Sequence, residues 1–242
     1  MISYTIFNQS TVVTTQQLTN MVKALNMFLV TVCSDWGLAS TQIVIGSGNS
    51  RPNNSIYLID YADVEGALGY HDEIGGKAYA KVFAKTILQY GGAILYKDNH
   101  TFSVASVLCH ELLEMMGNNQ VSKWYLNNDG ILYAGELCDA VESNIIVYTL
   151  PGNIKVALSD YVLPSWFSPD ASRPFNKTNT LTAPFTLDSG GYSIIIVITG
   201  GYIDTIYGST HQSGTSSLSS ITANSIKKDI MEISEQFKLK VK

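Results

Sequence analysis

The chain has 242 residues and a formal net charge of −5, and only 14% of its residues are Asp, Glu, Lys or Arg. This length can bury a substantial hydrophobic core without disulfides, and an acidic chain without a basic patch is not expected to bind nucleic acid. The sequence contains no apolar run of bilayer length and does not begin like a signal peptide, so we expect no membrane span and a cytoplasmic setting.

The first hundred residues alternate predicted strands with one long helix. Apolar residues recur at helical spacing from about Gln16 to Trp36, Thr14-Thr15 can cap this helix, and Gly37 can end it. Strands are expected over residues 3–8, 41–45, 55–61 and 79–84, the last of them at the sheet edge. A second helix, which contains His110, completes the order β-α-β-β-β-α.

The His110 helix carries the most informative pattern in the chain. In the segment SVLCHELLEMMG, His110 and Glu114 are four residues apart, so their side chains lie on the same face of a helix and can bind one metal ion. In the H-E-x-x-H motif of zinc hydrolases (zincins), the first Glu accepts a proton from the metal-bound water. Glu111 is therefore the candidate catalytic base, and Glu114 makes the motif an HExxE variant.

A second acidic segment, GELCDAVE over residues 135–142, follows this helix. Zincins whose third ligand is a glutamate often supply it from a comparable distance, so Glu136 is the preferred third ligand and Asp139 the next candidate. Glu142 is better suited to orienting His110. Such a carboxylate-rich set would bind zinc less selectively than His-His-Glu and could accept manganese or iron. It would also make a bound water less acidic, so catalysis could be slow or lost.

Alternatives to a zinc site remain open. His110 and the glutamates could form an internal polar network without metal, since structural ion pairs can mimic functional sites. The three cysteines are odd in number and lack a CxxC pair, so buried free thiols are expected. Because Cys109 and Cys138 adjoin the proposed ligands, a local disulfide or a soft-metal contact is the alternative.

The other histidines are predicted to lie in loops. His71 and Asp72 are placed in the turn before the edge strand, where His71 is either a catalytic helper or part of a capped turn that faces solvent. His100 and His211 are expected in surface loops.

After residue 143 the sequence favours β structure. Residues 144–150 and 153–158 flank Pro151-Gly152, which predicts a hairpin, and residues 192–199 form a β-branched run bounded by glycines. Three aromatic residues between these strands are expected to pack the extension onto the core, with an exposed binding platform as the alternative. They are Tyr161, Trp166 and Phe167.

The last part of the chain is predicted to contain a linker and a helix. Residues 207–222 are rich in Ser, Gly and Thr, and residues 223–242 show an amphipathic helical pattern. Such a helix could dock on its own domain or on a neighbouring subunit, so a homo-oligomer is expected. The predicted parts are a core over 1–143, a β-rich extension over 144–206, the linker and the C-terminal helix.

Several segments together resemble a family of bacteriophage and bacterial zincin-like proteins that carry the HExxE variant and a C-terminal β extension. The segments are ALGYHD at 67–72, YAKVF at 79–83, HELLEMMG at 110–117, ELCDAVE at 136–142, YVLPSWF at 161–167 and GGY at 190–192. The resemblance implies an α+β fold in which a zincin-like core precedes a β-rich extension and a C-terminal helix.

This resemblance also implies a setting and a function. We expect a zinc-binding component of a phage particle, located in the virion or the host cytoplasm, with other particle subunits as partners and with or without metallopeptidase activity. The alternative is an active soluble zinc metallopeptidase that cleaves a peptide substrate and has no structural role.

Overall fold

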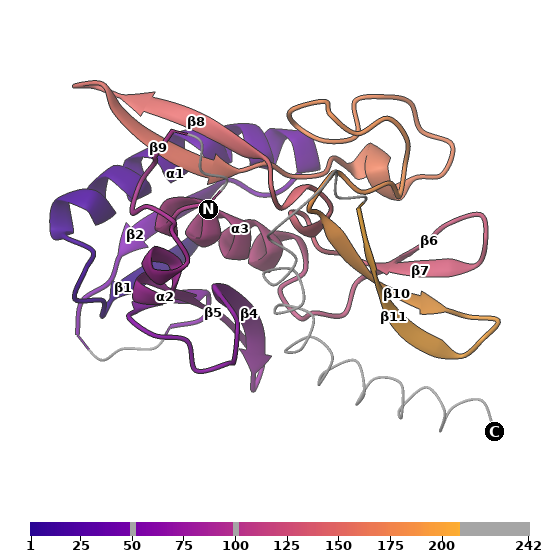
Figure 1. Ribbon diagram of the computed structural model, residues 1–242, viewed down its shortest axis with the longest axis horizontal. Helices are drawn as coiled ribbons and strands as arrows, with labels where there is room; N and C mark the ends of the chain where they lie inside the picture. The colour runs from indigo at the N-terminus through magenta and orange to yellow at the C-terminus, as the bar shows by residue number, and fades with distance from the viewer. Residues whose placement is uncertain (49–51, 99–101, 209–242) are drawn as a thin grey trace.

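The computed structural model describes residues 1–48, 52–98 and 102–208. These residues form a mixture of helices and sheets, consistent with the expected α+β class (Figure 1). In the described part of the chain, no helix combines the length and the apolar character needed to cross a membrane. The predicted helix over 223–242, most of the predicted linker, His100 and His211 lie outside the described residues.

A five-stranded sheet forms one layer of the molecule. Its strands are β1 (Ile2–Asn8), β2 (Thr41–Ile45), β3 (Ser55–Ile59), β4 (Gly69–Ile74) and β5 (Lys77–Phe83). The order is β2-β1-β3-β5-β4, with β4 antiparallel to β5 and every other pair parallel. The prediction that residues 79–84 form the edge strand is therefore wrong, because β4 occupies the edge. The sequence did not predict β4, since Gly, Asp and Glu are unusual in strands.

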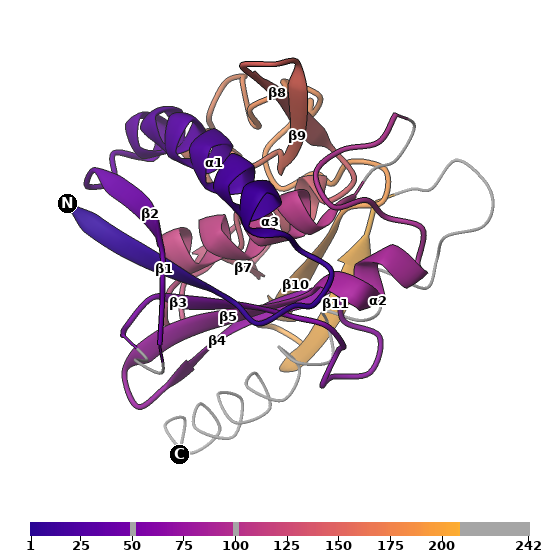
Figure 2. The same cartoon turned by 90° about the vertical axis from the view of Figure 1, so that its left-hand side faces the viewer.

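Two long helices cover one face of this sheet (Figure 2). Helix α1 spans Thr15–Trp36, and its ends confirm the prediction: Thr14 and Gln17 form a capping box, and Gly37 ends the helix in the left-handed region at φ 61°. The short helix α2 spans Ala84–Gln89, and α3 spans Val104–Gly117. Helix α3 packs against β4 and β5 on one side and against β9 on the other, so its side chains lie between two layers.

The second half of the chain is rich in β structure, as predicted. Its strands are β6 (Trp124–Leu126), β7 (Ile131–Ala134), β8 (Ile145–Leu150), β9 (Ile154–Ser159), β10 (Tyr192–Val197) and β11 (Tyr202–Tyr207). The hairpin at Pro151-Gly152 is confirmed, because β8 and β9 pair antiparallel on either side of it. Strands β11, β10, β7 and β6 form a separate sheet, of which only β10 was predicted. Two 3₁₀ helices span Asp139–Val141 and Pro164–Phe167.

The main hydrophobic core contains residues from both sides of residue 143. Leu150, Val156 and Leu158 of the β8–β9 hairpin pack into the same cluster as the apolar residues of α1 and α3. A second cluster surrounds Trp166. Tyr161, Trp166 and Phe167 are all buried, which confirms their predicted packing role and excludes the exposed platform. The hairpin and the five-stranded sheet therefore hold α3 in place from both sides.

Candidate metal centre

Helix α3 carries three ionisable residues into a nearly apolar environment. A capping box between Ser103 and Ser106 fixes its first turn. His110, Glu111 and Glu114 are all buried along with most of the helix. A charged group taken out of water is costly unless it is paired or bound to a metal. The partners of these three residues therefore decide what the helix does.

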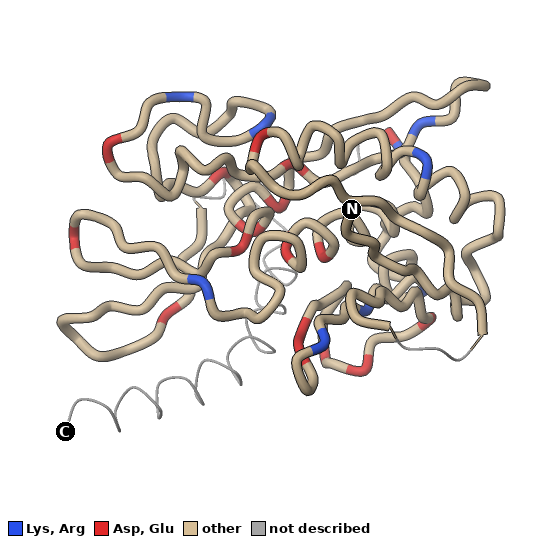
Figure 3. The backbone as a smooth tube through the Cα atoms, turned by 180° about the vertical axis from the view of Figure 1, so that it is seen from behind, with Lys and Arg blue, Asp and Glu red and all other residues tan. Residues whose placement is uncertain are grey.

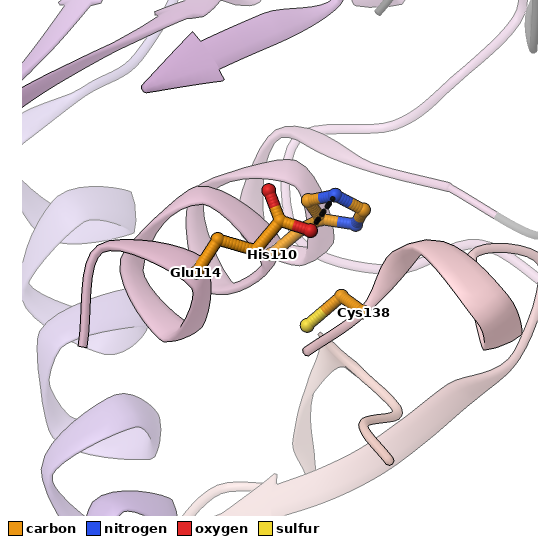
Figure 4. Close-up of side chains that lie close together, drawn as sticks. All are labelled: His110, Glu114 and Cys138. Atoms are coloured by element: carbon orange, nitrogen blue, oxygen red, sulfur yellow. Dashed lines mark ion pairs between the residues drawn. The ribbon is translucent and has the colours of Figure 1, made fainter. Parts of the chain in front are cut away.

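His110 and Glu114 meet as their spacing predicts. The distance from His110 Nε2 to Glu114 Oε1 is 2.9 Å. Asp139, at the start of the 3₁₀ helix, lies on the same side, with its Oδ1 3.2 Å from His110 Nε2. Cys138 also faces this pair (Figure 4), and the ligand atoms of His110, Glu114 and Cys138 all lie within 4.8 Å of one another.

His71 lies in the same cluster, which corrects its predicted place in a solvent-facing turn. It belongs to β4 and pairs with Ala80 of β5, a residue without solvent exposure. Directly opposite residues of two strands share one face of the sheet, so His71 points inward toward α3. Its Nδ1 lies 3.3 Å from Glu114 Oε2 and 3.5 Å from Glu111 Oε2. These three residues form a second group whose ligand atoms lie within 4.8 Å of one another.

Glu136 and Asp139 lie on different sides of the cluster. Glu136 Oε2 is 3.7 Å from His71 Nε2, while its Oε1 accepts a hydrogen bond of 2.9 Å from Asn118 Nδ2. The structure thus places Asp139 beside His110 and Glu136 beside His71. Glu142 ends the 3₁₀ helix after Asp139. In the described chain it forms no ion pair with His110.

The sequence interpretation missed two residues that shape the cluster. Asn118 caps the C-terminus of α3, and its Oδ1 accepts hydrogen bonds of 2.9 Å from the backbone of Ser122 and Lys123 while its amide orients Glu136. Gly69 leaves room for Glu111, because a Cβ atom there would lie 2.7 Å from Glu111 Oε1. For Asn118, the only signal in the sequence was its position directly after the glycine that ends the helix. The role of Gly69 could be recognised only from the fold.

The buried carboxylates lack the partners that a protein normally supplies. Atoms without a hydrogen-bond partner include His71 Nε2, Glu111 Oε2, Glu114 Oε1, Glu136 Oε2 and both Asp139 carboxylate oxygens. No Lys or Arg in the described ranges forms an ion pair with these four acids. Figure 3 shows acidic positions near the centre of the molecule, while most basic positions lie toward its periphery. Buried polar groups without partners are rare and call for an unseen water or ion.

The spacing of the polar atoms suits an ion between them. Two atoms each about 2.1 Å from one tetrahedral zinc ion stand about 3.4 Å apart. The contacts of His71 Nδ1 with Glu111 and Glu114, at 3.5 and 3.3 Å, match this separation. Glu114 Oε1 is only 2.9 Å from His110 Nε2 and still lacks hydrogen-bond geometry. These contacts therefore fit groups that share a metal ion better than a hydrogen-bonded network.

Burial and mutual repulsion perturb the acids of the cluster. Burial raises the pKa of Glu136 to about 7, and it also raises the pKa values of Glu111 and Asp139. Burial acts on Glu114 in the same direction, but the neighbouring His110 and His71 hold its pKa well below the usual range. Of the four acids, Glu114 is thus the one whose pKa is lowered rather than raised.

The two histidines respond to the same charges. Burial alone would lower the pKa of His71, but Glu136, Glu111 and Glu114 raise it well above its usual value. Burial likewise opposes the charged form of His110, and Glu114 and Asp139 outweigh it. Without a cation, the cluster must therefore hold protons to limit its negative charge.

The cysteines are free and buried, as expected. Cys109 and Cys138 form no disulfide, which excludes that alternative, whereas the position of Cys138 beside His110 and Glu114 leaves a soft-metal contact open. Burial raises the pKa of Cys138 well above its usual value, so the thiol is the favoured form without a metal.

Comparison with known proteins gave no match. No family model matches the chain, and no curated protein and no solved structure matches it significantly. Function is therefore inferred from the cluster itself. Its imidazole, carboxylate and thiol groups are the ligands that zinc and other divalent transition metals take in proteins.

Proposed function

We propose that this protein binds a divalent metal ion between α3, β4 and the segment that contains Glu136 and Asp139. The observation that carries the proposal is the Glu114 carboxylate, which is 1% exposed and faces a histidine nitrogen with each oxygen. Neither Lys nor Arg neutralises it in the described chain, and Oε1 has no hydrogen bond. A metal ion supplies the missing positive charge and occupies the unpaired oxygen lone pairs.

We further propose that the core is zincin-like. An HExxE helix lies against a sheet whose edge strand is antiparallel to its neighbour, and this arrangement supports the resemblance in the sequence. The centre departs from the zincin pattern in two ways. Glu114 replaces the second histidine, and His71 brings an imidazole from the edge strand instead.

Zinc is the proposed ion, because two imidazoles, carboxylates and an adjacent thiol suit it. The excess of carboxylates also suits manganese or iron, so the metal bound after purification would reflect availability as well as affinity.

Peptide hydrolysis is the second proposed function, and strand β4 favours it. In the described residues β4 pairs only with β5, so its outer edge can bind an extended peptide through main-chain hydrogen bonds. Gly69 of β4 lies against Glu111, which places the candidate base next to that edge. The bound metal would polarise the peptide carbonyl and acidify a water, and Glu111 would accept the proton of that water.

Metal content is the direct test of the first proposal. Tag-free protein purified without added metal should contain at least one equivalent of a divalent metal by elemental analysis. Glu114→Gln should lose it, while Glu65→Gln, which removes an exposed carboxylate outside the cluster, should retain it. If the wild-type protein is purified without metal and also fails to bind added zinc or manganese, the cluster is a polar network without metal and the proposal is wrong.

Cleavage of casein tests the second proposal. Metal-loaded protein should cleave it, and Glu111→Gln should abolish cleavage with the fold preserved by circular dichroism. If the loaded protein is inactive, the centre is a binding site without hydrolysis, and the first proposal stands.

Membership of a phage particle stays a proposal that rests on the resemblance in the sequence. Solution mass is its first test, because a particle subunit should form a homo-oligomer or bind other particle proteins. A strictly monomeric protein that binds none of them would contradict it.

A further inference from the structure

We infer that the cluster holds two divalent metal ions, bridged by the carboxylate of Glu114. One ion would be bound by His71 and Glu114 Oε2, with Glu111 beside it as the base that the proposed hydrolysis requires. The other would be bound by His110, Asp139 and Cys138 together with Glu114 Oε1. This inference rests on the proposed metal-binding function and specifies its stoichiometry and ligands.

The orientation of Glu114 is the first support. Its Oε1 lies 2.9 Å from His110 Nε2, and its Oε2 lies 3.3 Å from His71 Nδ1. The two oxygens of one carboxylate therefore face two different imidazoles. Carboxylates that bridge two metal ions present one oxygen to each, and the ions in such centres stand about 3.5–4 Å apart.

Each side of Glu114 has its own ligand group. His71, Glu111 and Glu114 bring their ligand atoms within 4.8 Å of one another, and so do His110, Glu114 and Cys138. Only Glu114 belongs to both groups. Buried atoms without hydrogen bonds occur on both sides, namely Glu111 Oε2 on the His71 side and both Asp139 oxygens on the His110 side. A single ion would leave one of these sides unsatisfied.

The charge of the cluster also favours two cations over one. Four buried carboxylates, those of Glu111, Glu114, Glu136 and Asp139, surround two histidines. Two divalent ions would leave only the thiolate of a metal-bound Cys138 uncompensated, whereas one ion would leave two more negative charges without a Lys or Arg partner in the described chain. Uncompensated buried charge is strongly unfavourable, so the two-ion state is favoured over the one-ion state.

Glu136 has a distinct part in this arrangement. His71 can bind an ion through Nδ1 only if the ring is held in the right tautomer and orientation. Glu136 Oε2 faces the other nitrogen, Nε2, at 3.7 Å, and Asn118 fixes Glu136 from behind. A carboxylate that accepts the free N–H of a metal-bound histidine is the usual companion of such a ligand. We therefore assign Glu136 as the partner of His71 Nε2 once the ion is bound; without the ion, their separation of 3.7 Å is too long for a hydrogen bond.

The two sides differ in chemistry, which allows them to be told apart. The His71 side offers one nitrogen and carboxylate oxygens, a set that manganese and iron accept readily. The His110 side adds the thiol of Cys138, a soft ligand that favours zinc. Manganese should therefore bind the His71 side in preference to the His110 side.

Metal stoichiometry tests the inference with the full chain. Tag-free protein, stripped of metal and reloaded with excess zinc, should retain two equivalents after desalting. His71→Gln and His110→Gln should each retain one, Glu114→Gln none, and Glu65→Gln two. Circular dichroism on each variant separates loss of a ligand from loss of fold, and the wild-type stoichiometry does not depend on any variant.

The outcomes distinguish this inference from the proposed function. One equivalent in the wild-type protein overturns the second site and leaves the metal-binding function intact, while none overturns both. Two equivalents that persist in His71→Gln place the second ion elsewhere and overturn the bridge. X-ray absorption of the loaded protein should show a metal–metal distance of about 3.5–4 Å, and its absence at full loading contradicts the bridge by Glu114.

Discussion

Asp160 and the His110 cluster are two buried acidic sites that the protein treats in opposite ways. Asp160 is fully buried, and its carboxylate accepts four hydrogen bonds. The donors are the backbone N–H groups of Tyr161 and Thr178, the Asn176 amide and the Thr178 hydroxyl, at distances of 2.5–3.2 Å. The acids around His110 have histidines within reach but leave several oxygens without any hydrogen bond.

This difference separates a structural polar network from a metal centre within one molecule. When the chain buries a carboxylate for structure, it surrounds both oxygens with N–H and O–H donors, which stabilise the charge without an ion. Around Glu114 the neighbours are two imidazoles and other carboxylates, and Oε1 still lacks a hydrogen bond. The contrast favours a metal over the internal polar network that the sequence left open.

Removal of metal should give the largest change in stability, and it should act on the His110 cluster and not on Asp160. An ion present at about 1,000 times its dissociation constant adds about 4 kcal/mol to the free energy of unfolding. For a chain of this size, a chelator should therefore lower the melting temperature by about 10 °C. Calorimetry of wild-type protein with and without EDTA measures this, and identical curves would contradict metal binding.

Substitution of Asp160 should give a comparable loss that does not depend on metal. Asp160→Ala leaves several buried donors without an acceptor, which should cost about 3 kcal/mol of unfolding free energy. Urea unfolding should show the same loss in zinc and in EDTA, and the metal content should equal that of wild type. A loss that appears only in zinc would mean that the two sites are coupled.

Gly69→Ala should disturb the metal centre by a steric clash and not by a change of charge. The new Cβ would lie 2.7 Å from Glu111 Oε1 and 2.8 Å from Val107 Cγ1, so Glu111 must move. We expect a loss of about 2 kcal/mol in stability and a zinc affinity at least about 10-fold weaker, measured by competition with a chelator.

Gly46→Ala is the matched control. Its Cβ would lie 2.5 Å from Phe7. Gly46 follows β2, which lies at the opposite edge of the sheet from β4, so the substitution should lower stability and leave the zinc affinity unchanged. Equal zinc affinity in the two variants would show that Gly69 does not contribute to the metal centre.

A change of pH should give the smallest change in the stability of the metal-free protein. The pKa of Glu136 is raised to about 7 in the folded state, whereas an unfolded chain leaves a glutamate near its ordinary value of about 4.3. Between these values the folded state binds more protons, so the stability falls as pH rises through this window. The pKa values of Glu111, Asp139 and both histidines are also raised, so these groups likewise lower the stability as pH rises.

Urea unfolding in EDTA at several pH values between 5 and 8 measures this slope. Glu136→Gln removes one titrating group and should flatten the slope by at most about 1.4 kcal/mol per pH unit. With zinc present the trend should reverse, because metal binding requires deprotonated ligands. Metal-free stability that increases from pH 5 to pH 7 would contradict the protonated cluster.

The sequence alone determined the features that depend on local spacing. Thr14, Gly37 and Pro151-Gly152 set the ends of α1 and the hairpin, because caps and turns act within a few residues. The alignment of His110 with Glu114 likewise follows from the helical repeat.

Only the tertiary structure decided which distant residues complete the cluster. His71 enters because β4 pairs at the sheet edge in a register that turns it inward, and a shift of one residue would point it away from α3. The path of the chain after α3 decided that Asp139 meets His110 while Glu136 meets His71. Strand register and loop path depend on packing across the molecule, so spacing along the chain cannot specify them.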